Sequence, residues 1–454
     1  MQNKPSLFSE FSEISSKQWK QQLHFELKGE DYNDVLVWSS PEDIKVRPFY
    51  HADENIPDYS IATKVSEFKI CQNIFVFDVE KSINKTNDSL RRGAESISYH
   101  IENATIDIEK LLDNSNLKNI TVHFNLNFIS AKFISKIENI ASKIGIKIYL
   151  NLDPIGHLAR DGNWMQTEHK DNFESLNKLS NSNPTISIDA SLYQNAGANI
   201  VQQLAYAMAH TNEYFNSCPN INKIIVLKVA IGSNYFFEIA KLRAIRMLFQ
   251  TISAEYQPDF ECFILATPSK RNKTIYDYNI NLLRTTTEST SAILGGAGAI
   301  SNLAYDAIYH KDNEFGDRLA RNQLLILKHE SYLDQVDNPS DGSYYIESLT
   351  QQLAEKALIL FKEIESAGGF IKQLKDGTIQ KKIAESAQKE QDLFNSGTEI
   401  LVGTNKYPNP NDHMKNDLEL YPFIKINPRK TLIIPIIEKR LADKMEQERL
   451  KCEV

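Results

Sequence analysis

The feature that most restricts how this chain can fold is a regular alternation of short apolar runs and longer helical patterns, starting near residue 70. The runs are rich in β-branched and aromatic residues and are apolar on both faces, as buried parallel strands are. They lie at Ile74–Asp78, Ser96–Ile101, Ile120–Phe124, Ile146–Leu150, Thr185–Ile188, Ile224–Ala230 and Phe260–Leu265, with a weaker eighth near Ala299–Leu303. Strand–helix units repeated in this order predict an α/β fold of the (β/α)8 (TIM) barrel type. An open, doubly wound sheet is the alternative, because periodicity cannot show closure.

The segments between the runs place apolar residues at helical spacing. Helices are predicted at Asn84–Arg92, Phe133–Lys143, Gly197–Tyr214 and Asn234–Thr251, and beyond the barrel at Leu349–Ser366 and Glu438–Leu450. Gly93 and Gly145 follow the first two and predict glycine C-caps.

The pattern divides the chain into three parts. Residues 1–50 form an extended N-terminal segment, residues 51–400 the barrel, and residues 401–454 a C-terminal linker and tail that ends in a helix. The N-terminal segment is polar, with the isolated aromatic residues Phe8, Phe11, Trp19 and Phe25. Such a segment cannot build a core of its own, so it is either a loose tail or a segment that covers another surface.

Composition narrows the functional classes. The formal net charge of −8 over 454 residues argues against nucleic acid as a partner, because phosphate binding needs a clustered basic surface. No apolar run approaches the about 18 residues of a membrane span, and the N-terminus lacks the apolar stretch of a signal peptide. We therefore expect a cytoplasmic protein without a membrane partner.

Residue types alone point to no reaction. Asp153 and Asp189 close the fourth and fifth predicted strands, and in a barrel the strand C-termini face the active side, which makes both weak site candidates. The glycine turn Gly295–Gly298 lacks the spacing of a phosphate-binding loop. The four cysteines include no C-x-x-C pair, so neither a metal site nor a disulfide framework is expected. The scattered histidines are interpreted as structural, so neither aspartate has a partner histidine or metal ligand and no reaction class follows.

Several longer stretches resemble the methylmalonyl-CoA mutase family. Asp317–Tyr345, DRLARNQLLILKHESYLDQVDNPSDGSYY, is similar to that family's D-R-x-A-R-N-x-x-x-I-L-x-x-E-S…D-P-x-x-G-S-Y-Y run. Arg284–Glu288 with Ala292–Gly296 is similar to R-T-T-x-E-x-x-x-A-x-L-G-G, and Phe236–Arg246 to F-x-E-x-A-K-x-R-A-x-R. Trp19 to Tyr50 resembles the family's N-terminal stretch, so the likeness covers nearly the whole chain.

The resemblance implies a barrel that binds an acyl-CoA, with the pantetheine arm threading the barrel axis. A separate flavodoxin-like domain holds adenosylcobalamin over the mouth, and the enzyme interconverts methylmalonyl-CoA and succinyl-CoA by radical chemistry. The cofactor supplies the radical, and the protein positions and shields it.

Three departures from the family pattern concern the active site. The stretch T-M-Y-x-x-R-P-W-T-I-R-Q-Y-A-G-F, which brings the substrate-facing tyrosine, is missing after Tyr50. Leu192 stands where the family's catalytic histidine donates a hydrogen bond to the substrate carbonyl, and an aliphatic side chain cannot donate that bond. The D-x-H-x-x-G signature of the cobalamin domain does not occur, and no cobalamin-binding domain is expected.

The departures predict the small, non-catalytic subunit of a heterodimeric mutase. We expect no catalytic, cofactor-binding or metal-binding residue on this chain. The partner is a large catalytic subunit that holds the adenosylcobalamin, and the N-terminal segment is expected to wrap around it. Two alternatives stay open: the catalytic barrel of a split mutase with a separate cobalamin chain, and a scaffold that binds acyl-CoA.

Overall fold

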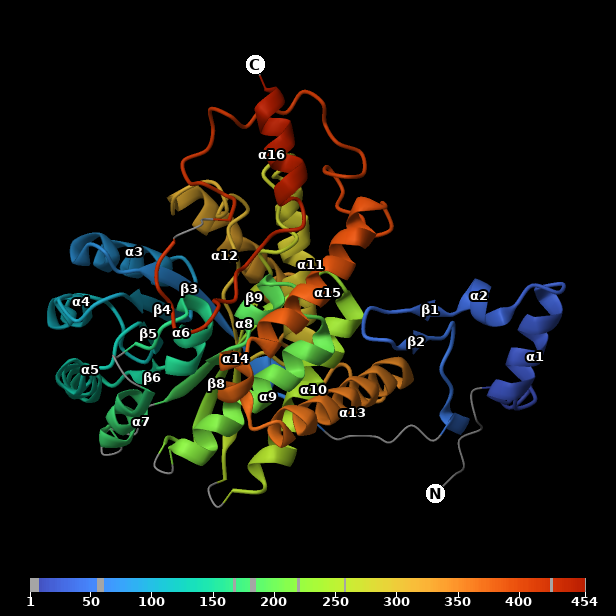
Figure 1. Ribbon diagram of the computed structural model, residues 1–454, viewed down its shortest axis with the longest axis horizontal. Coiled ribbons are helices and arrows are strands. Elements are labelled where there is room, and N and C mark those ends of the chain that lie inside the picture. Colours follow the sequence, from blue (N-terminus) through green and yellow to red (C-terminus); the bar gives the residue numbers. More distant parts are fainter. Residues whose placement is uncertain are drawn as a thin grey trace.

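The computed structural model describes residues 8–54, 61–165, 169–179, 185–218, 221–256, 259–424 and 428–453. Its centre is a ring of eight parallel strands surrounded by helices (Figure 1). The strands are β3 (Lys69–Phe75), β4 (Ser96–Ile101), β5 (Thr121–Leu126), β6 (Lys147–Asn151), β7 (Ile186–Asp189), β8 (Ile224–Ile231), β9 (Glu261–Pro268) and β10 (Ala299–Ile300).

The order of the strands shows that the sheet is a barrel. Neighbours run β6-β5-β4-β3-β10-β9-β8-β7, so β10 pairs with β3 and joins the last strand to the first. The two remaining edges, β6 and β7, meet through a parallel bridge between Leu152 and Ile186. The Ser187 N–H donates to the Leu152 carbonyl at 3.1 Å there. The predicted (β/α)8 barrel is confirmed, and the open sheet is excluded.

Helices cover the outside of the ring in chain order. They are α3 (Val79–Arg91), α4 (Ile108–Asp113), α5 (Ala131–Ile144), α6 (Pro154–Asp161), α7 (His169–Lys178), α8 (Ser191–Asn195), α9 (Ile200–Ser217), α10 (Tyr235–Ser253), α11 (Ile280–Leu294) and α12 (Glu314–His329). A further helix, α13 (Tyr344–Ser366), packs on α9 and α10, and α14 (Phe370–Lys375) and α15 (Thr378–Asn395) follow it.

Several predicted boundaries are wrong by a few residues, and three of the differences have a clear local reason. The first strand ends at Phe75 because Asp78, placed in the strand by the prediction, caps α3 by accepting from the Lys81 N–H at 2.9 Å. Helix α9 begins at Ile200 rather than Gly197, which has φ +101°. The last helix, α16 (Asp443–Cys452), begins later than Glu438 because the chain before it is extended against the barrel.

The N-terminal segment extends to one side of the barrel (Figure 1). It contains α1 (Ser16–Glu26), α2 (Tyr32–Leu36), the hairpin β1 (Trp38–Ser39) and β2 (Lys45–Val46), and the short 3-10 turn η1 (Ala52–Glu54); η2 (Val65–Glu67) then precedes β3. Ser15 and Gln18 form a capping box that starts α1, yet no residue of α1 is buried. The helix is therefore formed with little packing against this chain, mainly the edge-on contact of Trp19 with Phe49 at 6.1 Å between ring centroids.

Within the described residues the tail contains one helix, α16, near its end, where the sequence predicts one. Residues 428–442, here named the rim segment, cross the C-terminal end of the barrel. Their backbone bonds to the loops that follow three strands: the Leu432 N–H to Gly162 at 2.9 Å, Lys439 to Asn195 at 3.0 Å and Leu441 to Arg271 at 2.9 Å. Across the described ranges, the structure contains no helix with the length and apolar character needed to cross a membrane.

Candidate functional site at the barrel mouth

Side chains inside the barrel form a separate layer from those that face the helices. An interior cluster contains Cys71, Tyr149, Val226, Leu265 and Ala299. The neighbours of Val226 along β8, Ile225 and Leu227, belong instead to the main core between sheet and helices. Since strand side chains alternate, Lys228 faces the interior, one step nearer the mouth than Val226.

Three clustered rings lie in the barrel interior, and we name them the aromatic plug: His123, Tyr149 and Phe263. The ring centroids of His123 and Tyr149 lie 4.8 Å apart, those of Tyr149 and Phe263 5.1 Å, and those of His123 and Phe263 5.5 Å. His123 is 0% exposed and Tyr149 3%. Burial, with Lys228 and Lys147 adding to it, lowers the pKa of His123 to about 3, so the imidazole is neutral.

A polar layer lies directly above the plug. The Asn125 amide donates to Ser98 Oγ at 2.8 Å, and the Asn151 amide donates to Asn125 Oδ1 at 3.1 Å. Asn151 is 2% exposed, and its Oδ1 has no hydrogen-bond partner within the described structure. Such an unmet acceptor is costly in a protein interior.

Asp189, one of the two candidate aspartates, lies at the mouth as expected. It accepts from Arg160 at 2.8 Å and from the Ser191 hydroxyl, and Arg160 also donates to Glu438 of the rim segment at 2.7 Å. Burial raises the pKa of Asp189, but Arg160 and Lys228 outweigh it and hold the pKa at about 2. Its carboxylate is ionised and already paired, so it is not poised as a general base.

Asp153, the other candidate, is buried and does not face the mouth. Its Oδ1 accepts from His210 and from the Tyr214 hydroxyl, both at 2.9 Å, and its Oδ2 from the Asp189 N–H at 2.9 Å. His210 also bonds to the Tyr193 hydroxyl at 2.9 Å. This Asp–His–Tyr chain has the composition of a proton relay, but His210 and Tyr193 are each 0% exposed. Asp153 therefore fixes the loop between β6 and α6 rather than acting on a substrate.

Leu192 lies on α8, is 1% exposed and belongs to the main hydrophobic core. An aliphatic side chain packed in this way presents no donor to the mouth. The histidine in the upper interior of the barrel, His100, stacks on Phe75 with centroids 4.7 Å apart. Over the residues that the structure describes, no three His, Cys, Asp or Glu side chains converge as a metal site.

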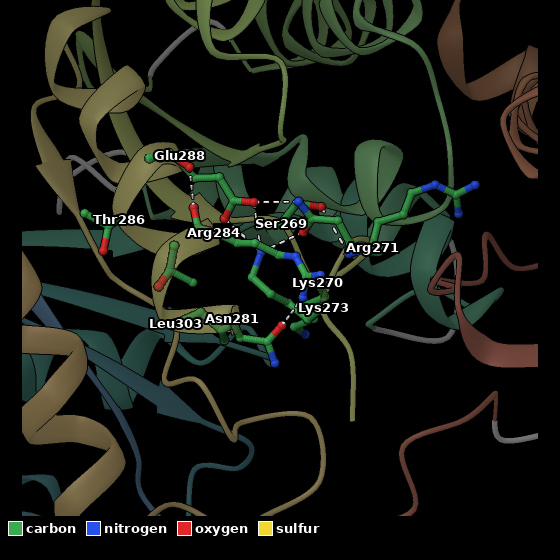
Figure 2. Close-up of polar contacts among 12 residues, drawn as sticks. Ser269, Lys270, Arg271, Lys273, Asn281, Arg284, Thr286, Glu288 and Leu303 are labelled. Carbon is green, nitrogen blue, oxygen red and sulfur yellow. Dashed lines mark hydrogen bonds and ion pairs between the residues drawn. The ribbon is translucent and has the colours of Figure 1, made fainter. Parts of the chain in front are cut away.

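The R-T-T-x-E stretch forms a buried polar cluster below the rim (Figure 2). Glu288 accepts from Lys273 Nζ at 2.8 and 2.9 Å and from the Asn272 amide at 2.6 Å. Arg284 donates to Asn281 at 2.8 Å. Lys273 and Glu288 are each 1% exposed. These residues therefore hold the loop after β9 against α11 and do not contact a substrate space.

The other stretches that carry the resemblance also join elements. Arg243 of α10, 1% exposed, donates to Glu347 of α13 at 2.6 Å and pairs with Asp341. Asp337 accepts from the Ser66 backbone N–H at 2.9 Å and from its hydroxyl at 2.8 Å, which ties the turn at 337–342 to the chain before β3. What these motifs maintain in this chain is the packing of the barrel.

Sequence reasoning missed the aromatic plug and Lys228. The sequence placed these residues in strands but did not show which way their side chains point. Strand side chains alternate between the barrel interior and the helices, and the two faces can be told apart only when the strand boundaries and the closure of the barrel are known. The available signal was three large rings at interior positions of β5, β6 and β9.

The fold and this mouth define a (β/α)8 barrel protein with three aromatic rings clustered in its interior and a rim segment bonded across part of its mouth. The family model described as Methylmalonyl-CoA mutase matches residues 101–433. The chain belongs to the methylmalonyl-CoA mutase family.

Similarity to individual proteins agrees with this assignment. The chain is 32% identical over 446 residues to the "Methylmalonyl-CoA mutase small subunit" of Porphyromonas gingivalis, covering 89% of this chain and 72% of that protein. It is 37% identical over 235 residues to the "Methylmalonyl-CoA mutase" of Cereibacter sphaeroides, and the match covers 49% of this chain and 33% of that protein. It is 25% identical over 456 residues to the "Probable methylmalonyl-CoA mutase, mitochondrial" of Caenorhabditis elegans, and the match covers 86% of this chain and 61% of that protein. The chain thus spans less than two thirds of the latter two proteins.

Proposed function

We propose that this chain is the small subunit of a heterodimeric, adenosylcobalamin-dependent methylmalonyl-CoA mutase, is itself inactive, and supports a large catalytic subunit in the cytoplasm. The observation that carries the proposal is the aromatic plug. In mutase barrels, as the resemblance implies, the pantetheine arm threads the axis, which requires an open channel. Here His123, Tyr149 and Phe263 cluster in the barrel interior at centroid distances of 4.8 to 5.5 Å. An interior packed in this way leaves no room for an extended chain.

The environment of Leu192 supports the same reading. If Leu192 takes the place of the catalytic histidine, no side chain there can stabilise charge on a substrate carbonyl. Loss of one such donor costs enzymes about 100- to 1,000-fold in rate. Since Leu192 is 1% exposed, it also cannot approach a substrate without unpacking the core.

The residues of this chain do not fit adenosylcobalamin. The cofactor domain's D-x-H-x-x-G sequence is missing. Of the histidines inside the barrel, His123 is held in the plug and His100 is stacked on Phe75, so neither is free to ligate a cobalt ion. We therefore place the cofactor on the large subunit and derive no step through it on this chain.

The N-terminal segment supports a partner-binding role. The side chains of Phe8, Phe11, Trp19 and Phe25 are 69%, 73%, 47% and 80% exposed, respectively. Aromatic residues at this exposure gain free energy when a second surface covers them. We propose that the segment wraps around the large subunit and buries these rings there.

The filled axis counts against both alternatives. A split catalytic barrel would need access for the substrate, and an acyl-CoA scaffold would need a channel for pantetheine. Neither use fits a Tyr149 ring that is 3% exposed on the axis.

Co-expression with a large chain that carries the tyrosine, the histidine and the D-x-H-x-x-G features tests the proposal. Size-exclusion chromatography should show a one-to-one complex. Mutase assays should show turnover that needs the large chain and no turnover by this chain alone. A chain that stays monomeric, or that turns over methylmalonyl-CoA when only a cobalamin domain is added, would contradict the proposal.

A further inference from the structure

Aromatic side chains gather where the N-terminal segment joins the barrel. We name five of them the ring ridge: Trp38, Phe49, Tyr50, Phe236 and Tyr345. The ring centroids of Tyr50 and Tyr345 lie 5.1 Å apart, and those of Phe236 and Tyr345 lie 5.4 Å apart. Trp38 lies against Phe237 of α10 at 5.7 Å, and Phe49 lies against Trp19 of α1 at 6.1 Å. The ring ridge therefore connects the starts of α10 and α13 with the N-terminal helix α1.

The base of the N-terminal segment is fixed to the barrel. Ile44, in the turn between β1 and β2, is 0% exposed, and Glu42 in the same turn is 7% exposed. The Ile200 N–H at the start of α9 donates to Glu42 Oε1 at 3.2 Å. The ring ridge is therefore formed before any partner binds, and a partner that covers it does not have to order it first.

The ring ridge is exposed, and the cation beside it already has a partner. Trp38 is 50% exposed and Phe236 48%. Arg47, whose guanidinium lies over the Tyr50 ring at 4.6 Å, donates to Glu54 at 2.9 Å. Covering the ring and its cation therefore leaves no unpaired guanidinium. Tyr, Trp, Phe and Arg are the residue types enriched where proteins contact each other, so this surface suits a protein partner.

The exposed aromatic area is that of a protein–protein interface. An aromatic side chain buries about 200 Å², so the four exposed rings between residues 8 and 25 offer about 540 Å². On the same basis, Trp38 and Phe236 add about 200 Å². The total of about 740 Å² is close to the about 800 Å² that each partner buries in a stable complex. The rings between residues 8 and 25 approach this area only together with the ring ridge.

We propose that the ring ridge packs against the large subunit of the mutase and continues the contact that the N-terminal segment begins. The inference rests on the proposed function and extends it, because it adds the starts of α10 and α13 to the interface. The large subunit is the occupant because Phe49 and Trp19 connect the ring ridge to the segment that wraps around that subunit. A surface that fits the ring ridge is apolar and supplies no anion, because Arg47 already has its carboxylate.

Hydroxyl-radical footprinting of this chain alone and in the purified pair with the large subunit tests the contact, because oxidation reports the solvent exposure of aromatic side chains. The oxidation rates of Trp38 and Phe236 should fall at least about threefold in the pair, because rings that change from half exposed to buried lose most of their accessible area. Phe315 of α12, 51% exposed and in ring contact with Tyr305, is the matched control and should keep its rate.

Substitution measures what the contact contributes to affinity. Phe236→Ala should weaken binding of the large subunit at least about tenfold by calorimetry, as the loss of a buried aromatic anchor does. Phe315→Ala should leave the affinity unchanged. Because both side chains are about half exposed, thermal melts should show that both variants stay folded.

The outcomes separate this inference from the proposed function. A pair that forms while Trp38 and Phe236 stay equally reactive, or that forms as tightly with Phe236→Ala, would overturn the inference alone. Parent chains that form no pair would refute the proposed function and the inference with it. Protection of the ring ridge in this chain alone as its concentration rises would show that a second copy covers the surface, and would also overturn the inference.

Discussion

The aromatic plug can be tested by removing one of its three rings. Tyr149 is 3% exposed and contacts both His123 and Phe263, at centroid distances of 4.8 and 5.1 Å. Tyr149→Ala deletes both ring pairs, worth about 1–3 kcal/mol together. It also leaves a hole on the axis, and aromatic-to-alanine changes in cores cost about 3–5 kcal/mol in total. We therefore expect the free energy of unfolding to fall by about 3–5 kcal/mol.

Urea denaturation followed by circular dichroism measures this loss as a lower midpoint at an unchanged slope. Tyr149→Phe is the matched control, because it keeps the ring and removes a hydroxyl that makes no hydrogen bond with the described residues. Its free energy of unfolding should stay within about 1 kcal/mol of that of the parent chain. The opened axis should also bind benzene, as dry apolar cavities do. A loss below about 1 kcal/mol in Tyr149→Ala would show that the ring does not pack in the axis, and the reasoning would fail.

Three further results are expected. Asp189 keeps a folded pKa of about 2, against about 3.9 in unfolded chains, so it stabilises the fold above about pH 4, and this contribution is lost as the pH falls toward 2. Asp189→Asn should lower the free energy of unfolding by about 2 kcal/mol at pH 7 and reduce its dependence on pH between pH 4 and 2, as measured by thermal melts at each pH. The same loss of stability between pH 4 and 2 as in the parent chain would contradict this. Glu288→Ala should cost about 3–5 kcal/mol because it strands a buried Lys273, whereas adding Lys273→Met should restore much of the loss in urea melts; additive losses would refute the pairing. The double substitution Trp19→Ala and Phe25→Ala should keep the free energy of unfolding within about 0.5 kcal/mol of the parent chain, because both side chains are exposed. It should weaken binding to the large subunit at least about tenfold, as measured by calorimetry. Unchanged binding would show that the N-terminal segment is not part of the interface.

Much of the barrel could be predicted from periodicity because seven of its strands are buried on both faces. The first strand was displaced because Lys69, Gln72 and Asn73 interrupt its apolar pattern, while Val76 and Phe77 extend that pattern past the point where Asp78 starts α3. Closure could not be predicted, because it depends on a single bridge between β6 and β7 that joins segments with no local signal.

The site was less accessible to sequence reasoning. The position of Asp189 at the mouth followed from its place at the end of a strand, and the same rule misplaced Asp153, whose carboxylate turns to His210 and Tyr214. The rim segment has no periodic pattern, because its backbone bonds to barrel loops rather than to itself. The plug depends on rings from three separate strands that meet only in the closed barrel.

The most direct measurement of the central claim is the number of acyl-CoA sites. Isothermal titration of methylmalonyl-CoA into this chain alone, into the large subunit and into the purified pair counts them. The account predicts no site on this chain and one site for each pair, supplied by the large subunit. A second site in the pair, or saturable binding to this chain alone, would show that the barrel axis admits substrate and would contradict the account.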